Sequence, residues 1–381
     1  MFYLTQTRRK FCATVVAAAM MTGFGTSQSL AQIKYPEGFN PDDWVMVASV
    51  INTTNPYMIS NIEGAKAASK ALGIKLEIVN SNGSSQTSIS NILAILASGK
   101  KPIMFVNTVA SSDAPTIVDA VGKAGGFVSI WWNKPDEFKP ADVGDHFVAF
   151  QKHPGVESGR CGAKALADAI GGKGNVVLLP GVPDSTTSQT RVAGFRAEIT
   201  EKYPDVKILD ERPSNWDPQL AAKNSQDLIV KYGSEINGVW SADDGMQIGA
   251  MQAFENAGLL DKVKFSSDGL YPKTLEDIIS GRGGKAIVGE TFHRGYMASE
   301  IGLYTAYLAA SGQIEPSKLP VEKRESLFKL SCVTPANYQQ YLKYDEPGAA
   351  DAFMTRLIDT GPWATDPVPL IGAGPEVLPG K

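Results

Sequence analysis

Residues 44–50 read "WVMVASV", and residues 55–73 read "NPYMISNIEGAKAASKALG". The first segment is a continuous apolar run of strand length, which is typical of a strand buried on both faces. The second segment places apolar and small side chains on one helical face, at Met58, Ile62, Ala65, Ser69 and Leu72. Together they predict a buried strand that leads through a short turn into an amphipathic helix.

The same strand-and-helix pair recurs along the first half of the chain. Further strands are predicted at residues 75–79, 102–106 and 127–132, with helical patterns around residues 89–96 and 115–124 between them. Neighbouring parallel strands need a crossover connection, which is usually a helix. We therefore expect a parallel sheet with helices on both faces.

A second series of strand and helix patterns predicts a second domain of the same design. Its strands are expected at residues 175–181, 206–211, 238–244, 263–269 and 285–291. A chain of 381 residues with 43% hydrophobic content is long enough for two such domains. The predicted fold class is α/β, with two doubly wound parallel-sheet lobes.

The first 31 residues have the features of a cleaved export signal. Arg8, Arg9 and Lys10 form a positive start, an apolar run follows at residues 13–21, and residues 29–31 give a small-x-small ending. The run is shorter than the roughly 20 apolar residues that a membrane span needs. The segment "TRRKF" resembles a twin-arginine export motif, and an ordinary secretory signal is the alternative. Either route predicts a periplasmic protein.

Composition and spacing exclude several classes of function. The formal charge is -4 without a basic cluster, which argues against a nucleic-acid partner. The histidines show no spacing typical of zinc sites, and the glycine-rich segments fit neither a P-loop nor a dinucleotide fingerprint, so no metal or cofactor is expected. The adjacent acids Asp243 and Asp244 cannot face each other across a glycosidic bond, and we do not expect an enzyme.

Two cysteines remain once Cys12 leaves with the export signal. The oxidising periplasm permits a disulfide between Cys161 and Cys332, and two separate buried thiols are the alternative. The sequence alone leaves both arrangements open.

Aromatic and acidic residues gather at the predicted carboxyl ends of the strands, beyond which open α/β sheets bind their ligands. The residues there are Asn55, Tyr57, Trp131, Trp132, Asn133, Trp216, Asp243, Asp244, Asp268 and Glu290. Aromatic faces stack on the C–H patches of sugars, and carboxylates and amides bind sugar hydroxyls. This set of residues predicts a binding site for a sugar or polyol.

The pair Trp131 and Trp132 ends one of the predicted strands. Successive strand residues face opposite ways, so only one of the two rings should face a ligand unless the backbone turns there. A core position is the alternative for either ring. Asn133, the next residue, is expected to be a polar contact.

The segment "NTTNPYM" at residues 52–58 supplies a second group of candidate contacts. Asn55 is expected to cap the following helix, with Pro56 at its first position. Tyr57 and Met58 then lie in the first helical turn, beside backbone N–H groups that are free to bind a ligand oxygen. A plain helix cap is the alternative.

Four further segments extend this pattern: "TRVAGFRAEI" (190–199), "WSADDGMQIGAMQAFENAGL" (240–259), "VKFSSDG" (263–269) and "KAIVGET" (285–291). From about residue 44 to 332, the chain resembles the periplasmic sugar-binding proteins of ribose/galactose type, which are type I solute-binding proteins of ABC transporters. The cores of LacI-type repressors share this pattern. A repressor needs an N-terminal helix-turn-helix, however, where this chain has an export signal.

The resemblance implies two lobes joined by three hinge crossings, with the ligand enclosed when the lobes close. The crossings are expected near residues 150, 291 and 330. The first lobe then comprises residues 44–150 and 291–329, and the second comprises residues 151–290 and 330–381. In this C-terminal extension, a helix is predicted around residues 335–358.

The resemblance also implies a role for the candidate residues by position. The first lobe supplies Asn55 and Tyr57, whereas the second supplies Trp216 as a stacking ring. The implied acceptors of ligand hydroxyls are Asp243, Asp268 and Glu290.

Three residues at two sites depart from the ribose-type pattern. Trp131 and Trp132 stand where an Asp–Arg pair is common. Gln189, itself a candidate ligand contact, stands where an arginine is expected, two positions before the "RxxGF" motif. These changes remove two cations and an acid from the expected sugar contacts and argue against ribose itself. Arg191, within the motif, is assigned a structural role.

The expected function is capture of a neutral monosaccharide or sugar alcohol between the lobes and its delivery to an ABC importer. The alternative is a cationic amine or quaternary ammonium ligand, held by cation–π contacts in an aromatic and acidic cage. The implied partners are the permease in the inner membrane and, as a second candidate, a chemoreceptor. The protein is expected to act as a monomer without a cofactor.

Overall fold

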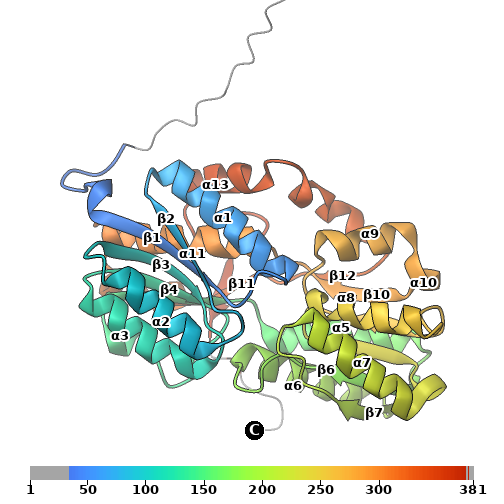
Figure 1. Cartoon of the computed structure of the whole chain (residues 1–381). Coiled ribbons are helices and arrows are strands. Elements are labelled where there is room, and N and C mark those ends of the chain that lie inside the picture. The colour runs from blue at the N-terminus through green and yellow to red at the C-terminus, as the bar shows by residue number, and fades with distance from the viewer. Residues whose placement is uncertain (1–33, 375, 377–381) are drawn as a thin grey trace, which may run out of the picture. The chain divides into compact units, whose positions relative to one another are not determined.

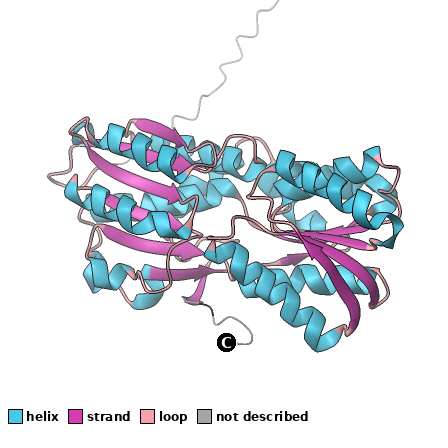
Figure 2. Ribbon diagram, turned by 60° about the horizontal axis from the view of Figure 1, so that its bottom comes forward, coloured by secondary structure: helices cyan, strands magenta, loops and turns pink. Residues whose placement is uncertain are grey.

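Residues 34–374 and residue 376 are described by the computed structural model, and the predicted export signal at residues 1–31 lies outside them. Two β-sheets flanked by helices account for most of the described chain (Figures 1 and 2). Both belong to one unit, residues 32–381. None of the described helices combines the length and the apolar character that crossing a membrane requires.

The first sheet has seven strands in the order β13-β11-β5-β4-β3-β1-β2. Their bounds are β1 (Trp44–Val50), β2 (Leu76–Asn80), β3 (Lys101–Asn107), β4 (Phe127–Trp131), β5 (Phe147–Lys152), β11 (Glu325–Phe328) and β13 (Leu370–Ala373). Neighbouring strands are parallel except for β13, which runs antiparallel to β11. The four strands predicted in the first half of the chain are confirmed.

Helices cover both faces of the first sheet. One face carries α1 (Pro56–Leu72) and α11 (Gly295–Ala310), the other carries α2 (Ser85–Leu96) and α3 (Ala114–Lys123), and the short helices are α4 (Pro140–Val143) and α12 (Val321–Arg324). Met46 of β1 packs in the core that includes α1 and α11, whereas its neighbour Val47 packs in the core that includes α2 and α3. Both faces of β1 are therefore buried, which is why the strand is apolar except at Ser49.

The second sheet has six strands in the order β12-β10-β9-β8-β6-β7. Their bounds are β6 (Lys173–Leu179), β7 (Asp205–Glu211), β8 (Gly238–Ser241), β9 (Lys264–Ser266), β10 (Ile287–Thr291) and β12 (Cys332–Val333). The helices of this half are α5 (Gly155–Ala169), α6 (Thr186–Lys202), α7 (Pro218–Tyr232), α8 (Asp244–Asn256), α9 (Pro272–Ser280) and α10 (Arg282–Lys285). Only β12 runs antiparallel to its neighbour. The predicted α/β class is confirmed.

The chain passes between the two sheets at several points. It leaves the first sheet after β5, returns to it between β10 and α11, and leaves it again between β11 and β12. These passages lie beside the crossings expected near residues 150, 291 and 330. The lobe boundaries drawn from those crossings stay a prediction.

The C-terminal extension takes a different course from the predicted one. After β12, a 3-10 helix (Tyr338–Asp345) leads to α13 (Ala349–Thr360), which packs against α1 and α11, and β13 then joins the first sheet (Figure 1). The prediction that residues 330–381 belong to the second lobe is therefore wrong for α13 and β13. The buried side chains of α13, such as Phe353 and Leu357, show that the helix has an apolar face but not which sheet it covers.

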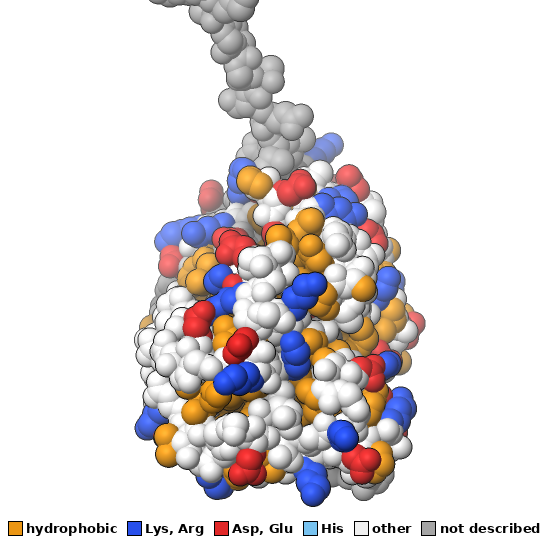
Figure 3. All heavy atoms as spheres, turned by 90° about the vertical axis from the view of Figure 1, so that its right-hand side faces the viewer, with side chains coloured by type: hydrophobic (Ala, Val, Ile, Leu, Met, Phe, Trp, Pro, Cys, Tyr) orange, Lys and Arg blue, Asp and Glu red, His pale blue; other side chains and the backbone are white. Residues whose placement is uncertain are grey.

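The face of the molecule in Figure 3 carries a mixture of positive and negative side chains. Over the described residues of this face, lysine and arginine side chains do not gather into one basic area. Opposite charges thus lie side by side on this face rather than in separate patches. This face offers little of the concentrated positive surface on which binding to a phosphate backbone depends.

Cys161 and Cys332 form a disulfide, with their Cα atoms 5.7 Å apart. Of the two arrangements that the sequence left open, the bridge is therefore the one found. It joins α5 to β12 across a sequence separation of 171 residues. The bridge fixes the start of the C-terminal extension to the second half of the molecule.

Replacing both cysteines by serine should lower the free energy of unfolding by about 2–5 kcal/mol, because a long loop is no longer closed in the unfolded chain. Chemical denaturation of the oxidised protein and of the Cys161→Ser/Cys332→Ser variant measures the difference. Equal denaturation midpoints and slopes for the two proteins would contradict the expectation.

Candidate functional site

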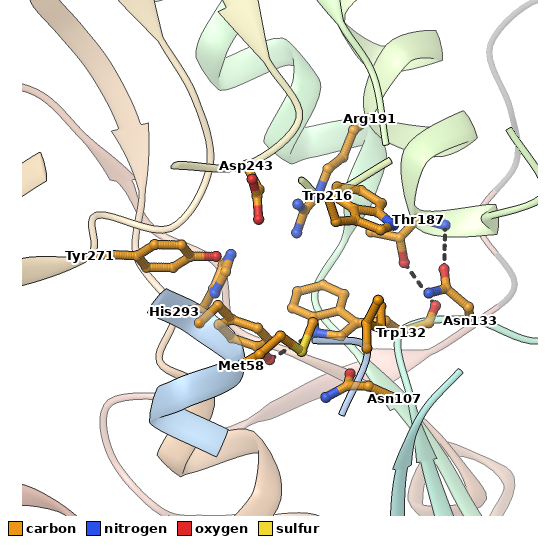
Figure 4. Close-up of a pocket in the computed structure, with 12 residues that line it drawn as sticks. Met58, Asn107, Trp132, Asn133, Thr187, Arg191, Trp216, Asp243, Tyr271 and His293 are labelled. Atoms are coloured by element: carbon orange, nitrogen blue, oxygen red, sulfur yellow. Dashed lines mark hydrogen bonds between the residues drawn. The ribbon is translucent and has the colours of Figure 1, made fainter. Parts of the chain in front are cut away.

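A pocket lies where strand ends of the two sheets meet (Figure 4). The residues that line it are Ile51, Tyr57, Met58, Asn107, Trp132, Asn133, Thr187, Arg191, Trp216, Asp243, Tyr271 and His293. Ile51 and Asp243 follow β1 and β8 closely, and Asn107 ends β3. The position matches the rule that open α/β sheets bind ligands beyond the carboxyl ends of their strands.

Three helices begin at this pocket, each with a capping side chain. Asn55 caps α1 at 2.9 Å from a backbone N–H of the first turn, Ser185 caps α6 at 3.1 Å, and Asp243 caps α8 at 2.9 Å. Each cap satisfies a backbone N–H that has no partner within its own helix. Short polar residues therefore follow the strands for a local reason, and the helix starts face the pocket.

The backbone turn between Trp131 and Trp132 decides which ring faces the pocket. Trp131 ends β4, is only 1% exposed and stacks on Phe328 in the core, with 5.4 Å between ring centroids. Trp132 has a φ of 78°, in the left-handed region, and its ring lines the pocket. Its Nε1 donates a hydrogen bond of 2.7 Å to the hydroxyl of Tyr57. A bulky side chain at such a φ is strained, and such strain is concentrated at functional sites.

Trp216 brings a second ring into the pocket from the other half of the molecule. Its φ is 61°, and that of Asn215 before it is 54°, so both backbones are left-handed. The ring lies so close to Gly181 that a Cβ atom at that position would overlap with it. Its Nε1 is buried and has no hydrogen-bond partner among the described residues. Trp216 thus combines an apolar face with a free donor, the two features that a sugar or polyol requires.

Asn55 and Asp243 join the two halves beside the pocket. The Nδ2 of Asn55 donates a 2.6 Å hydrogen bond to the Oδ2 of Asp243, and a longer one of 3.4 Å to the carbonyl oxygen of Trp216. Asn55 lies behind the pocket wall, whereas Asp243 is part of it. Burial raises the pKa of Asp243 from 3.8 to about 6, because the charged form is poorly solvated there.

This raised pKa predicts a pH dependence of stability. The folded protein holds the proton of Asp243 more tightly than the unfolded chain does. The protonated group therefore adds to the free energy of unfolding below pH 3.8, and this contribution is lost as the pH rises to about 6. The free energy of unfolding of the wild type should fall by on the order of 3 kcal/mol over this range, relative to that of Asp243→Asn, which cannot lose this proton. Denaturation curves of both proteins between acidic and neutral pH measure it. Parallel stability profiles would contradict the assignment.

Asn133 and Thr187 make a second connection between the halves. The Oδ1 of Asn133 accepts hydrogen bonds from the Oγ of Ser185 at 2.7 Å and from the backbone N–H of Thr187 at 3.1 Å. The hydroxyl of Thr187 donates to the carbonyl oxygen of Trp132 at 2.8 Å. The left-handed turn at Trp132 is therefore held from the start of α6.

Arg191, Asp268 and His293 form a buried charged group at the pocket. Asp268 Oδ1 lies 2.6 Å from His293 Nε2 and 3.1 Å from an Arg191 nitrogen. The guanidinium of Arg191 lies 4.8 Å from the centre of the Trp132 ring and also donates to the carbonyl oxygen of Ala242 at 2.6 Å. Arg191 and His293 line the pocket, and Asp268 stands behind them.

Two opposing effects set the pKa values in this group. Burial alone would raise the pKa of Asp268, but the charge of Arg191 and the hydrogen bond from His293 outweigh it and hold that pKa below its usual value. Burial lowers the pKa of His293 despite the nearby carboxylate. His153, stacked on His293 with 5.7 Å between ring centroids, has its pKa lowered to about 3, chiefly by burial. At neutral pH both histidines are neutral and Asp268 is charged.

Glu290 belongs to a separate buried cluster. Its carboxyl group accepts a hydrogen bond from Gln247 at 2.8 Å. The hydroxyl oxygen of Ser267 lies 2.8 Å from a carboxyl oxygen of Glu290 and is also within hydrogen-bond distance of Asp244. Burial raises the pKa of Glu290 well above its ordinary value, and the charge of Asp244 adds to this effect. The other oxygen of Asp244 accepts from the backbone N–H of Tyr271. The cluster thus supports the loop that carries Tyr271.

The structure brings six of the predicted site residues to the pocket wall: Tyr57, Met58, Trp132, Asn133, Trp216 and Asp243. Asn55, Trp131, Gln189, Asp268 and Glu290 lie outside this wall, and their direct contact with a ligand stays a prediction. Gln189 is exposed and donates to the carbonyl oxygen of Pro183, and the other four are buried with partners or core neighbours behind the wall. Strand-end position alone does not distinguish a wall residue from one behind it.

Six wall residues were missed or assigned another role from sequence: Ile51, Asn107, Thr187, Arg191, Tyr271 and His293. Asn107 ends β3, so the strand-end rule could have found it. Both polar atoms of its side chain are buried and have no partner within the described part of the chain. Arg191 lay within a motif that was given a structural role, and His293 follows "KAIVGET" by two residues.

Within the described residues, no group of three or more His, Cys, Asp or Glu side chains is placed to hold a metal ion. The pocket wall instead combines five aromatic or imidazole rings with amide, hydroxyl, guanidinium and carboxylate groups. Such a wall can stack on apolar faces and bind hydroxyl groups at its polar positions.

Residues 46–310 match the family model of the periplasmic binding protein domain. The chain belongs to this family. The resemblance drawn from the sequence motifs is thereby confirmed, as is an extracytoplasmic location, which the family implies. The family consists of binding proteins.

Two known relatives align with about two thirds of this chain or more. A xylitol-binding protein of Mycolicibacterium smegmatis is 25% identical over 276 residues, which cover 71% of this chain and 74% of the relative. A ribose import binding protein of Salmonella typhimurium is 23% identical over 267 residues, which cover 68% of this chain and 80% of the relative. The crystal structure of a twin-arginine translocation pathway signal protein from Burkholderia phytofirmans has a TM-score of 0.79 and 29% identity, covering 87% of this chain and 99% of that one.

Proposed function

We propose that this protein captures a neutral monosaccharide or sugar alcohol in the pocket and delivers it to an ABC importer. The observation that carries the proposal is the pair of rings at Trp132 and Trp216. They come from the two halves of the molecule, and both stand at strained left-handed positions in the pocket wall. Rings held in this way are suited to stack on the C–H faces of a sugar or polyol.

Polar atoms without partners support a hydroxylated ligand. The Nε1 of Trp216, the side-chain amide of Asn107 and the Nε of Arg191 are buried and have no hydrogen-bond partner among the residues described. A buried donor or acceptor without a partner costs about 1–3 kcal/mol. Ligand hydroxyls, which both donate and accept, would recover this free energy.

A cationic ligand is not favoured by the charges of the pocket. Arg191 places its guanidinium in the wall and pairs with the carboxylate of Asp268, so this carboxylate is not left to hold an amine or a quaternary ammonium group. The one carboxylate in the wall, Asp243, already accepts from Asn55 and from the backbone of α8, and burial raises its pKa to about 6. The relatives named above carry a polyol and a sugar in their names. These observations together favour a neutral ligand.

The binding mechanism that we propose is closure of two lobes around the ligand. Hydrogen bonds from Asn55 to Asp243 and from Ser185 to Asn133 cross between the halves beside the pocket. A ligand that contacts both halves shifts the equilibrium toward the closed form by its difference in affinity for the two forms. The permease of the importer would then recognise the closed surface.

Further parts of the proposal concern export and partners. We propose a twin-arginine signal at residues 1–31, supported by the segment "TRRKF" and by the name of the Burkholderia phytofirmans protein. The protein would act as a monomer, with a chemoreceptor as a second partner, without a cofactor, and without altering the ligand. Recovery of a labelled sugar or polyol unchanged after incubation with the protein tests the last point.

A thermal-shift screen of the mature protein tests the proposed ligand class. The panel contains pentoses, hexoses, sugar alcohols and, as cationic probes, choline and tetramethylammonium. A ligand that binds only the folded state raises the melting temperature, by an amount that grows with its concentration relative to Kd. We expect shifts with one or more neutral probes and none with the cations. Shifts with the cations alone would contradict the proposal.

A further inference from the structure

His293 has one ring nitrogen bound and one free at the pocket. Its Nε2 lies 2.6 Å from the Oδ1 of Asp268, whereas its Nδ1 is buried and has no hydrogen-bond partner among the residues that the structure describes. A carboxylate can only accept, so Nε2 must carry the proton. In the neutral ring, Nδ1 then has a lone pair and is an acceptor.

Neighbouring rings hold this imidazole in place. The ring of Tyr57 meets it edge-on at 5.1 Å between centroids, Trp132 lies at 5.2 Å, and His153 stacks on it at 5.7 Å. Burial lowers the pKa of His293, which keeps the ring neutral and the lone pair available. His293 therefore adds a fixed acceptor to a wall whose other free polar atoms are mainly donors.

Asp268 also forms an ion pair with Arg191. The same Oδ1 lies 3.1 Å from Arg191, and the side chains of both residues are 3% exposed or less. The charge of Arg191 in the pocket wall is therefore compensated from behind. An anionic ligand would find this cation already paired, and would also meet the lone pair of His293 and the carboxyl group of Asp243.

We propose that the Nδ1 of His293 accepts a hydrogen bond from a ligand hydroxyl, and that Asp268 is the positioning residue that fixes the His293 tautomer and compensates Arg191. The site should consequently prefer a neutral sugar or polyol to the corresponding carboxylate. This inference rests on the proposed sugar or polyol binding and adds to it a specificity determinant.

The wild-type protein provides a test that needs no variant. Isothermal titration of the mature protein with xylitol, D-xylose, D-ribose and D-xylonate compares three neutral probes with one carboxylate of similar size. We expect D-xylonate to bind at least about tenfold more weakly than the tightest neutral probe. Equal or tighter binding of D-xylonate would overturn the inference while leaving a saccharide-binding function in place. No binding of any of these neutral probes, together with no shift by any neutral probe of the thermal-shift screen, would overturn the proposed function, and the inference with it.

Two substitutions of His293 test the acceptor itself. His293→Phe keeps an aromatic ring between Tyr57 and His153 but removes Nδ1, and should weaken binding of the neutral probe about tenfold or more. His293→Asn can place its side-chain oxygen near the position of Nδ1 and should recover part of the affinity. Equal affinities of the wild type and His293→Phe, at a retained cooperative melting transition, would overturn the role of His293.

Asp268→Asn tests the positioning role through a change in preference. It leaves Arg191 uncompensated, so the ratio of D-xylonate affinity to neutral-probe affinity should rise about tenfold or more. The matched control is Asp277→Asn, which removes another buried carboxylate, one that contacts Arg282 at 2.9 Å outside the pocket wall. The control should leave this ratio unchanged. An equal loss of affinity for all probes in Asp268→Asn would show that Asp268 is only structural.

Discussion

Replacing Trp216 by alanine should lower the affinity for the ligand about 100-fold, which corresponds to about 3 kcal/mol. The substitution removes a stacking face and the buried Nε1 that has no partner in the described structure. It also leaves a space opposite Gly181 that water can enter, so the remaining contacts weaken. Isothermal titration with the tightest ligand of the thermal-shift screen measures the effect.

Trp363→Ala is the matched control for this prediction. Trp363 is partly buried beside Lys323 and is not a wall residue, so its loss should reduce stability but leave affinity within about threefold. Gly181→Ala provides an independent approach to the same ring, because the added Cβ would overlap with Trp216. It should weaken binding although Gly181 itself contributes no side chain. An affinity within threefold of wild type for Trp216→Ala would contradict the proposed role of the ring.

Arg191→Met should lower the free energy of unfolding by about 3–5 kcal/mol, because it leaves the carboxylate of Asp268 buried without its cation. Asp268 is 1% exposed, and its pKa lies below the usual value because of Arg191 and His293. Without the arginine, that pKa should rise above its usual value. Urea denaturation at neutral pH measures the loss of stability, and ligand titration should give weakened binding as well.

The double variant Arg191→Met/Asp268→Asn separates charge from packing. With both partners neutral, at least half of the lost stability should return, because the unpaired charge is gone. Arg282→Met is the control: Arg282 pairs with Asp277, but its side chain is 19% exposed and water can replace it in part. The loss of unfolding free energy in Arg282→Met should be less than half of the loss in Arg191→Met. A loss below about 1 kcal/mol for Arg191→Met would contradict the account of the buried group.

Local patterns in the sequence were sufficient to predict the elements of the fold. The apolar run of β1 reflects burial of the strand on two faces, and the helical spacing of α1 reflects burial of the helix on one face. Both elements lie where the sequence predicts them. The course of the C-terminal extension was not predictable in this way. The buried face of α13 fits any apolar surface, and only the three-dimensional arrangement assigns it to α1 and α11.

The candidate site was predictable in its location and in about half of its wall. Position after a strand identified Trp132, Trp216 and Asp243, because the topology brings strand ends together. The same rule could not separate Trp132 from Trp131. That choice depends on a φ of 78° at Trp132, a conformation that a tryptophan does not favour by itself and that tertiary contacts impose.

The group of Arg191, Asp268 and His293 shows a second limit of sequence reasoning. The three residues come from α6, from the segment after β9 and from the segment after β10, and they meet only in the folded chain. Sequence patterns identified Asp268 as a direct ligand contact and Arg191 as structural. The structure instead places Arg191 in the wall and Asp268 behind it. Which side chain reaches the pocket wall is decided by packing depth, which residue types at strand ends do not encode.

A crystal structure of the mature protein with the tightest ligand of the screen would test the central claim most directly. We expect a neutral sugar or sugar alcohol between the rings of Trp132 and Trp216, with hydroxyls within hydrogen-bond distance of Asn107 and His293. Ligand density at any other place on the molecule, with this pocket filled by water alone, would contradict the account.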